Sequence, residues 1–275
     1  MSSSTATLFM KWMTPVIVLW GLSYPLTKLV TYYSSPMIVS VVRVLVGFIF
    51  FYLLGRGLSI GLNEFINGLL NFAIFLTFLN LGIYFSPNPG LVAIMIYTQP
   101  LFILIIEAIL GNKISIREII GIIMGVIGIT ASAFLNFNLG LLFGLGAGLV
   151  FAIGAVYYRR KVAKQDVIKL NAFMTLSSLP ILLALTPLDF HFTLNLINII
   201  LLITLGLTSQ VGGFYFWFNA IKHLGSIKAG AGSLLVPVMA YVLTYAFFRT
   251  IPTPLETIGS AITLIGVYLT MSSNK

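Results

Sequence analysis

The sequence predicts an all-α membrane protein, with ten transmembrane helices arranged as two inverted five-helix repeats. Of the 275 residues, 59% are hydrophobic and only 8% are charged, whereas a soluble domain carries about 25% charged residues. Apolar runs of about 20 residues, long enough to cross a bilayer as a helix, recur along the whole chain. The second half also resembles the first in the order of its prolines, glycines and glutamates.

Each helix is expected where an apolar run lies between residues typical of turns. In chain order the ten ranges are 13–33, 36–54, 65–85, 90–110, 117–135, 139–158, 168–187, 194–219, 228–248 and 253–271. Turn chemistry marks the breaks at Ser34-Ser35-Pro36, Gly55-Arg56-Gly57, Ser86-Pro87-Asn88-Pro89, Asn136-Phe137-Asn138 and Pro252-Thr253-Pro254. The second helix is short and the eighth is long.

The basic residues indicate how these helices are oriented. With the N-terminus in the cytoplasm, twelve of the 15 lysines and arginines fall on the cytoplasmic side: Lys11, Arg56, Lys113, Arg117, Arg159, Arg160, Lys161, Lys164, Lys169, Lys222, Lys228 and Lys275. Arg249 falls outside, and Lys28 and Arg43 lie within spans. Because short cytoplasmic loops carry an excess of Lys and Arg, we expect a multi-pass plasma-membrane protein with both termini in the cytoplasm.

Several functional classes find no support in the sequence. The formal charge of +9 would favour a nucleic-acid partner for a soluble protein, but here the loop charges account for it. The chain has no cysteine, which excludes disulfides and thiolate metal sites. No HExxH, GxSxG or Walker pattern occurs, and His191 and His223 are expected on opposite sides of the membrane. We therefore expect no enzyme, metal, cofactor or nucleic-acid partner.

The two halves of the chain match in detail. Pro100 matches Pro237, the stretch 20–28 matches 151–159, and Glu118, Gly121 and Gly128 recur 138 residues later as Glu256, Gly259 and Gly266. Each repeat, 1–135 and 139–275, then holds five helices, and an odd number places the second copy upside down. Inverted repeats are a transporter architecture, with substrate at the repeat interface near the membrane midplane.

At this point the chain resembles the drug/metabolite transporter superfamily, and within it the EamA family of ten-helix carriers. The resemblance is carried by Trp20-Gly21, Lys28, Pro36, Arg43, Pro100-Leu101, Gly121, Gly128, Pro237-Val238, Gly259 and Gly266. It implies a cavity lined by the first, third, fourth, sixth, eighth and ninth helices, and substrates such as amino acids, other metabolites or drugs. The family often has a glutamate about thirteen residues after each of the matched prolines, Pro100 and Pro237. In this chain those positions fall near Lys113 and Thr250, so the sequence departs from the family there.

Pro100 and Pro237 lie near the middle of their spans, at matching places in the two repeats. A proline removes a backbone donor and displaces the carbonyl four residues earlier, here those of Ile96 and Ser233. Such a carbonyl must face protein, water or ligand, because lipid cannot satisfy it. Each proline alone could equally mark a simple kink, but the pairing favours a flexing centre at the binding site.

The first helix carries a stripe of aromatic residues with polar tips. Trp20, Tyr24 and Lys28 recur at i, i+4 and i+8, and Pro25 loosens the same turn. Trp20 and Tyr24 are expected to form the stacking walls of a cavity. Lys28 has two interpretations: an interfacial lysine that reaches the headgroups, or a group that attracts a carboxylate and so favours an amino or organic acid.

Other residues within the spans complete the candidate cavity. Gln210, Phe214 and Trp217 share a face of the eighth helix, Tyr97 and Gln99 flank Pro100, and Asn80 lies in the third helix. The two glutamines and Asn80 are expected to orient a solute. Any one of them could instead bond a neighbouring helix, but as a set they indicate a wet cavity with aromatic walls, suited to a small amphipathic solute.

Glycines and one glutamate bear on the mechanism. Gly140, Gly144, Gly148 and Ala152 lie four apart on the sixth helix, as do Gly121 and Gly125 on the fifth, which indicates packing seams. Glu107 is expected near the cytoplasmic end of its helix, where it either pairs with Lys113 or Arg117 or takes part in proton coupling.

These observations lead to the hypothesis of a secondary carrier for small organic metabolites, an exporter or exchanger that works by alternating access. Two alternatives stay open: a passive channel for small solutes, and a membrane-embedded enzyme that acts on lipids. The expected partners are a small-molecule substrate and the lipid bilayer, and the sequence leaves monomer and homodimer undecided.

Overall fold

The computed structural model describes residues 3–86, 89–134, 138–249, 251 and 253–273. Within these residues the secondary structure is helical, and the strand-like pairing is confined to an isolated bridge between Ser34 and Phe192. The turns expected at 87–88, 135–137 and 252 lie outside the described residues.

Helical segments lie within each of the ten expected ranges, and several are α-helices joined through π-helical (η1, η2, η4, η6) or 3₁₀ (η3, η5) turns. In the first half they are α1 (Ser3–Leu8), η1 (Phe9–Met13), α2 (Thr14–Val30), α3 (Pro36–Gly55), α4 (Leu62–Gly68), η2 (Leu69–Ile74), α5 (Phe75–Phe85), α6 (Pro89–Met95), η3 (Ile96–Thr98), α7 (Gln99–Ile109) and α8 (Ile116–Phe134). In the second half they are α9 (Leu139–Tyr157), η4 (Tyr158–Val162), α10 (Val167–Leu185), η5 (Thr186–Leu188), α11 (Leu196–Leu205), η6 (Gly206–Gly213), α12 (Phe214–Leu224), α13 (Ser226–Ser233), α14 (Leu235–Phe248) and α15 (Pro254–Met271).

Within the described chain, eight helical stretches are long and apolar enough to cross a membrane: Ser4–Val30, Pro36–Gly55, Leu62–Phe85, Leu139–Val162, Val167–Leu188, Leu196–Leu224, Ser226–Phe248 and Pro254–Met271. Ile96–Ile109 is a shorter apolar helix. Large apolar side chains are exposed along the helices, among them Ile49, Leu53, Ile105, Ile127, Leu196 and Ile265. Lipid solvates such a surface, so the fold is that of an all-helical, multi-pass membrane protein.

The first helix differs most from its expected range, because it begins at Ser3 and ends at Val30 instead of spanning 13–33. Hydropathy detects only the apolar part of a helix, whereas packing extends it. The ring of Trp12 stacks on that of His223 with centroids 5.1 Å apart, which ties the N-terminal turns to the end of α12. For the same reason the sixth and eighth helices continue to Val162 and Leu224, beyond their expected ends.

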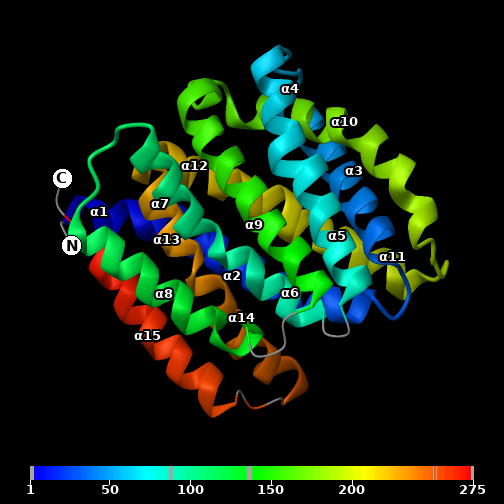
Figure 1. Cartoon of the computed structure of the whole chain (residues 1–275). Helices are drawn as coiled ribbons and strands as arrows, with labels where there is room; N and C mark the ends of the chain where they lie inside the picture. The colour runs from blue at the N-terminus through cyan, green and yellow to red at the C-terminus, as the bar shows by residue number, and fades with distance from the viewer. Residues whose placement is uncertain (1–2, 87–88, 135–137, 250, 252, 274–275) are drawn as a thin grey trace.

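α8 and α15 pack against each other along their length (Figure 1). Glycines form the contact: a methyl group built on Gly121 would collide with the Gly266 backbone, and one built on Gly128 would lie 2.5 Å from the Gly259 carbonyl oxygen. The Thr263 hydroxyl donates to the Gly125 carbonyl at 3.1 Å between these two contacts. The helices are therefore antiparallel. Gly121 contacts Gly266, which is the repeat counterpart of Gly128, and Gly128 contacts Gly259, which is the counterpart of Gly121.

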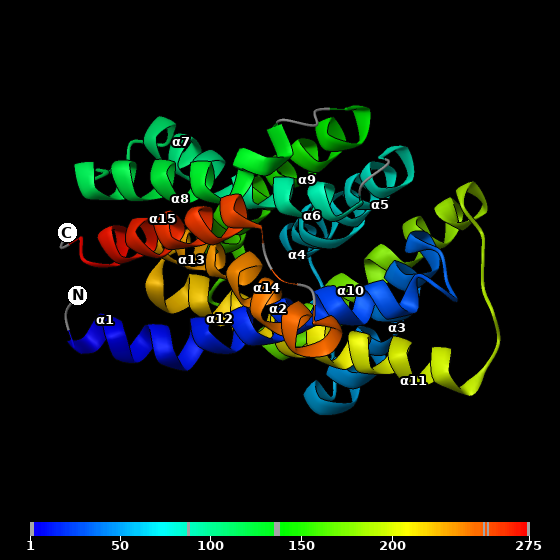
Figure 2. The same cartoon turned by 90° about the horizontal axis from the view of Figure 1, so that it is seen from below.

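The remaining helices surround a common centre. α2 packs against α14, η6 and α12, while α9 packs against α5, α6 and α7, and α3 packs against α10. The glycine seam of α9 makes its contacts possible: methyl groups on Gly144 and Gly148 would lie 2.9 and 3.0 Å from the carbonyls of Val92 and Ile96. The start of α1 and the end of α15 lie at the same end of the bundle in both views (Figures 1 and 2).

The fourth and ninth helices, which carry the matched prolines Pro100 and Pro237, are both interrupted close to those prolines. The fourth changes from α6 through the 3₁₀ turn η3 to α7, which begins at Gln99-Pro100, and the ninth changes from α13 to α14 at Leu234, just before Pro237. Pro100 alone would predict a free Ile96 carbonyl. The carbonyl is bonded instead, because the 3₁₀ turn lets the Gln99 amide donate to it. The chain thus satisfies this carbonyl locally while still breaking the helix.

Candidate substrate-binding site

A central cavity of about 780 Å³ lies between the two halves of the helical bundle. Residues of α2, α3, α5, η3, α9, η6, α12 and α14 line it, and its volume falls in the range of small-molecule sites. Three of its lining residues, Lys28, Thr31 and His191, are exposed. The cavity therefore opens at the end of the bundle formed by the α2–α3 and α10–α11 connections.

Aromatic rings close the other end of the cavity. The Trp20 ring lies 5.3 Å from that of Phe214 and 6.0 Å from that of Phe151, and Phe75 stacks on Phe151 at 4.6 Å. Beyond this layer the ring of Trp217, 5.4 Å from Trp20, is fully buried. We call Trp20, Phe75, Phe151 and Phe214 the aromatic floor, because a solute entering from the open end would meet these rings.

A polar wall faces the cavity beside the aromatic floor. The Arg43 Nη2 donates to the Ser209 hydroxyl at 2.7 Å, and the Trp20 Nε1 donates to the Ser209 carbonyl at 3.1 Å. One turn before Arg43, the Ser40 hydroxyl and the Asn80 amide exchange hydrogen bonds of 3.1 and 3.3 Å. Both halves of the chain therefore contribute to the wall. Ser209 links the two helices of the first half, because it accepts hydrogen bonds from both Arg43 and Trp20.

Seven of the predicted site residues line the cavity: Trp20, Tyr24, Pro25, Lys28, Asn80, Tyr97 and Phe214. A side-chain hydrogen bond joins Tyr24 to Tyr97 across the two helices. The Lys28 ammonium lies 4.5 Å from the centre of the Phe248 ring, at the open end. Helical spacing on α2 predicted this face because i, i+4 and i+8 stay aligned in an α-helix.

The other predicted residues, Gln99, Gln210, Trp217, Pro100, Pro237 and Ser233, are not part of the cavity lining. Gln210 is fully buried and packs at Gly47, where a methyl group would lie 2.7 Å from its Cγ. The π-helical turns of η6 shift the register, so Gln210 does not stay on the face of Phe214. Trp217 lies behind the floor, and Gln99, two residues beyond Tyr97 at the end of the 3₁₀ turn, lies on a different side of the helix.

Arg43 and Ser209 belong to the site but were not among the predicted binding residues. The signal for Arg43 was present, since an arginine within a membrane span is costly and marks a functional site by default. Ser209 carried no such signal, because serines are common in membrane helices and only the fold brings it to α3.

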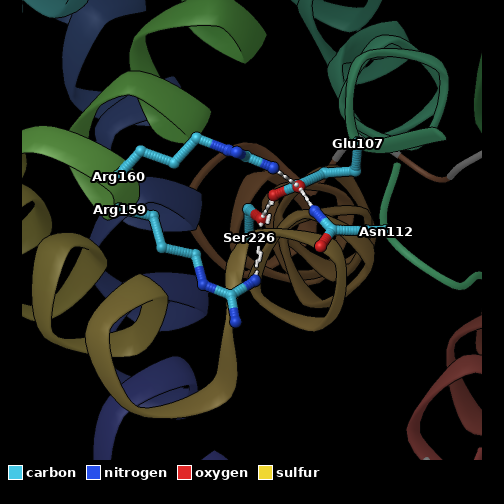
Figure 3. Close-up of polar contacts among 5 residues, drawn as sticks. All are labelled: Glu107, Asn112, Arg159, Arg160 and Ser226. Carbon is cyan, nitrogen blue, oxygen red and sulfur yellow. Dashed lines mark hydrogen bonds and ion pairs between the residues drawn. The ribbon is translucent and has the colours of Figure 1, made fainter. Parts of the chain in front are cut away.

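At the end of the bundle remote from the cavity mouth, five residues form the Glu107 cluster: Glu107, Asn112, Arg159, Arg160 and Ser226 (Figure 3). Glu107 lies ten residues beyond Tyr97, a rise of about 15 Å along a helix. Its carboxylate is 3.3 Å from Arg160 Nη2 and 3.8 Å from Arg159 Nη1. It also accepts hydrogen bonds from the Ser226 hydroxyl and the Asn112 amide.

The partners of Glu107 differ from the predicted Lys113 and Arg117. Sequence proximity favours those two, but Glu107 is buried and faces η4 and α13, where the two arginines and Ser226 lie. The cluster thus connects α7 with α13, the halves of the fourth and ninth helices that lie farther from the cavity mouth.

No group of three or more histidine, cysteine or acidic side chains that could hold a metal occurs among the described residues. The ring of His223 stacks on Trp12, and His191 lies at the cavity mouth. The residues that line the cavity offer a bound solute hydrogen bonds, positive charge and aromatic rings.

Membrane-length helices around an internal, solute-sized cavity are typical of a membrane transport protein. A family model described as the EamA-like transporter family matches residues 7–134 and 138–272, and the chain belongs to this family.

Curated relatives carry transporter names, and a solved structure shares the fold. The chain is 23% identical over 252 residues to "Uncharacterized transporter YvbV" of Bacillus subtilis, covering 85% of this chain and 82% of the relative. It is 23% identical over 286 residues to the "Probable amino-acid metabolite efflux pump" of Salmonella typhimurium, covering 92% and 91%. A crystal structure of a protein with 18% identity shares the fold with a TM-score of 0.80, over 98% of this chain and 96% of the other.

Proposed function

We propose that this membrane transporter is a secondary carrier that moves small organic solutes by alternating access. The observation that carries the proposal is the central cavity, which is open at one end of the bundle and closed at the other by the aromatic floor and the Glu107 cluster. A carrier must expose its site to one side at a time, and this structure would be one of its two states.

The proposed architecture is ten membrane helices in two inverted five-helix repeats, 1–135 and 139–275. The reciprocal glycine contacts between α8 and α15 support it, because a two-fold axis makes residue i contact j and the equivalent of j contact the equivalent of i. Thr263, which binds the Gly125 carbonyl, is itself the counterpart of that glycine in the repeat. The shared end for the start of α1 and the end of α15 agrees with an even number of crossings.

The proposed movement separates α7 from α13 while the opposite ends of the same helices approach each other. The breaks beside Pro100 and Pro237 would let each half-helix turn without distorting its partner. Breaking the Glu107 cluster would then open the cavity at its present floor. The fourth helix also contacts the smooth glycine face of α9, which permits sliding.

The proposed substrate is an amino acid or a similar amphipathic metabolite, and the proposed direction is export or exchange. Support comes from the amphipathic cavity lining and from relatives named as probable amino-acid metabolite efflux pumps. The proposed location is the plasma membrane with both termini in the cytoplasm, as the twelve-to-one distribution of loop lysines and arginines predicts. The proposal applies equally to a monomer or a homodimer.

Counterflow in proteoliposomes tests the proposal. Vesicles preloaded with an unlabelled amphipathic solute should accumulate the labelled solute transiently, because one carrier exchanges both. A passive channel equilibrates the label without an overshoot, and an enzyme acting on lipids gives no solute flux. Absence of an overshoot with every solute of an amino-acid and organic-acid panel would contradict the carrier.

A further inference from the structure

We propose that Arg43 is the anion-binding residue of the central cavity, and that the cavity selects organic oxyanions over zwitterions and amines. This inference rests on the proposed carrier function and narrows its substrate class: among the amphipathic metabolites proposed above, it favours those whose only charged group is an anion, in place of the amino acid. The group bound would be a carboxylate or the chemically similar phosphonate or phosphate of a solute with an apolar body.

Arg43 lines the cavity with a cation that has not used all of its donors within the described residues. Its Nη2 donates to Ser209, but no partner is recorded for its buried Nε. The planar guanidinium carries five N–H donors and stays charged, so it suits the two oxygens of a carboxylate. A guanidinium without a neutralising carboxylate is costly inside a membrane protein, and an anionic ligand would relieve that cost.

Nothing acidic competes for Arg43. All six acidic residues lie in the described part of the chain, and none lines the cavity. Each has another setting: Glu64 accepts from Gln165, Glu107 from its cluster, Glu118 from the Ser115 amide, Asp166 caps α10, Asp189 accepts from the Met37 amide and Glu256 caps α15. The described ion pairs all involve Glu107.

The same absence of carboxylates disfavours an ammonium group in the cavity. The charged or titratable side chains that line it besides Arg43 are Lys28, His191 and the tyrosines Tyr24 and Tyr97. Lys28 and His191 lie at the mouth and add positive potential or none. A zwitterion would therefore bring its ammonium group to a site without a counter-charge, whereas an anion brings only the group that Arg43 binds.

The aromatic floor would hold the apolar body of such a solute. Ser209 positions both parts, because its hydroxyl holds Arg43 while its carbonyl holds the Trp20 indole. An anion on Arg43 is thereby adjacent to the rings of Trp20 and its neighbours. The geometry thus fits an aromatic or branched-chain acid with one charged end.

The test compares solutes that share one body and differ in charge. Binding to the full chain in lipid nanodiscs is measured by calorimetry for 3-phenylpropionate, 2-phenylethylphosphonate, phenylalanine, phenethylamine and 3-phenylpropanol. We expect at least one of the two anions to bind tenfold or more tighter than the zwitterion and the amine; the tighter anion shows whether the class is carboxylate or phosphorylated. An amine or zwitterion that binds as well as the anions, or no binding of either anion, overturns the inference.

Variants then assign the preference to Arg43. Arg43→Gln should lower anion affinity at least tenfold and leave the alcohol unchanged, and Arg43→Lys should retain part of it because it keeps the charge without the planar fork. The matched control is Arg117→Gln, an exposed arginine outside the cavity. If Arg43→Gln does not fold, Ser209→Ala, which removes the hydroxyl that holds Arg43, should still weaken anion binding several-fold. Unchanged anion affinity in a folded Arg43→Gln or Ser209→Ala protein contradicts the role of Arg43.

The two proposals can fail separately. Counterflow of a solute whose affinity is unchanged by substitutions at Arg43 would support the carrier and contradict the anion-binding role of Arg43. Anion binding that depends on Arg43, without counterflow of any solute of the panel, would support the anion site and contradict the carrier.

Discussion

Replacing Glu107 by alanine removes the acceptor that joins α7 to α13. The Arg159 and Arg160 side chains are 45% and 40% exposed, so water and salt screen the two ion pairs, which contribute about 0–1 kcal/mol. The hydrogen bonds from Ser226 and Asn112 reach a carboxylate that is 1% exposed, and bonds to a charged group contribute about 1.5–3 kcal/mol. Relaxation of the exposed arginines into water offsets part of this, which leaves a net loss of about 1–3 kcal/mol.

If the cluster holds this end of the bundle closed, that loss lowers the population of the present state relative to the state open at the opposite end. A loss of about 1–3 kcal/mol corresponds to about a 5- to 150-fold change in the ratio of the two states. The sequence contains no cysteine, so a single introduced thiol reports accessibility without background. Ile103 suits the probe, because it is 0% exposed and its Cδ1 packs at Gly230 of α13.

The assay measures the rate at which a water-soluble maleimide labels Ile103→Cys in membranes. The rate should rise by the same factor when Glu107→Ala is added. Glu64→Ala is the matched control, because Glu64 is also a buried carboxylate but accepts its hydrogen bond from Gln165 and does not join α7 to α13. An unchanged labelling rate in folded Glu107→Ala protein, or an equal rise in the Glu64 control, would refute this reasoning.

Three further outcomes are expected. Gly259→Ala should lower the thermal midpoint in detergent by several degrees, since its methyl group would collide with the Gly128 carbonyl and overpacking costs about 1–3 kcal/mol, whereas Gly57→Ala, with the nearest contact at 3.9 Å, should leave it unchanged. Tyr24→Ala should abolish most counterflow while the protein remains folded, because it removes a cavity wall and the partner of Tyr97; normal counterflow would remove Tyr24 from the site. Gln210→Leu should keep counterflow and match or exceed the wild-type thermal midpoint, because the buried amide has no recorded hydrogen-bond partner; loss of counterflow in folded protein would return Gln210 to the site.

The helices and one face of the site could be predicted from residue patterns, whereas the rest of the site could not. Trp20, Tyr24 and Lys28 line the cavity as expected, because α2 remains regular through Pro25 and helical spacing then sets the face. The same spacing predicted Gln210 beside Phe214, but Gln210 is not part of the cavity lining, because η6 is π-helical and a regular spacing no longer applies.

The ion-pair partners of Glu107 could not be predicted from the sequence. Glu107 was paired with basic residues close to it in the chain, but the structure pairs it with Arg159 and Arg160, more than fifty residues away. A buried carboxylate takes whichever donors the fold brings within reach, and sequence distance carries little information on that.

The sequence by itself indicated that lipid surrounds the protein, where the apolar helices lie and which residues of the two halves match. These features could be recognised because hydropathy and helical period act locally along the chain. Packing in three dimensions determined the cavity, the residues that line it and the hydrogen-bond partners of each polar group. Those properties depend on which helix faces meet, through contacts such as Gly121 on Gly266 and Arg43 on Ser209. Such contacts join residues over a hundred positions apart, where local physical preferences no longer determine the outcome.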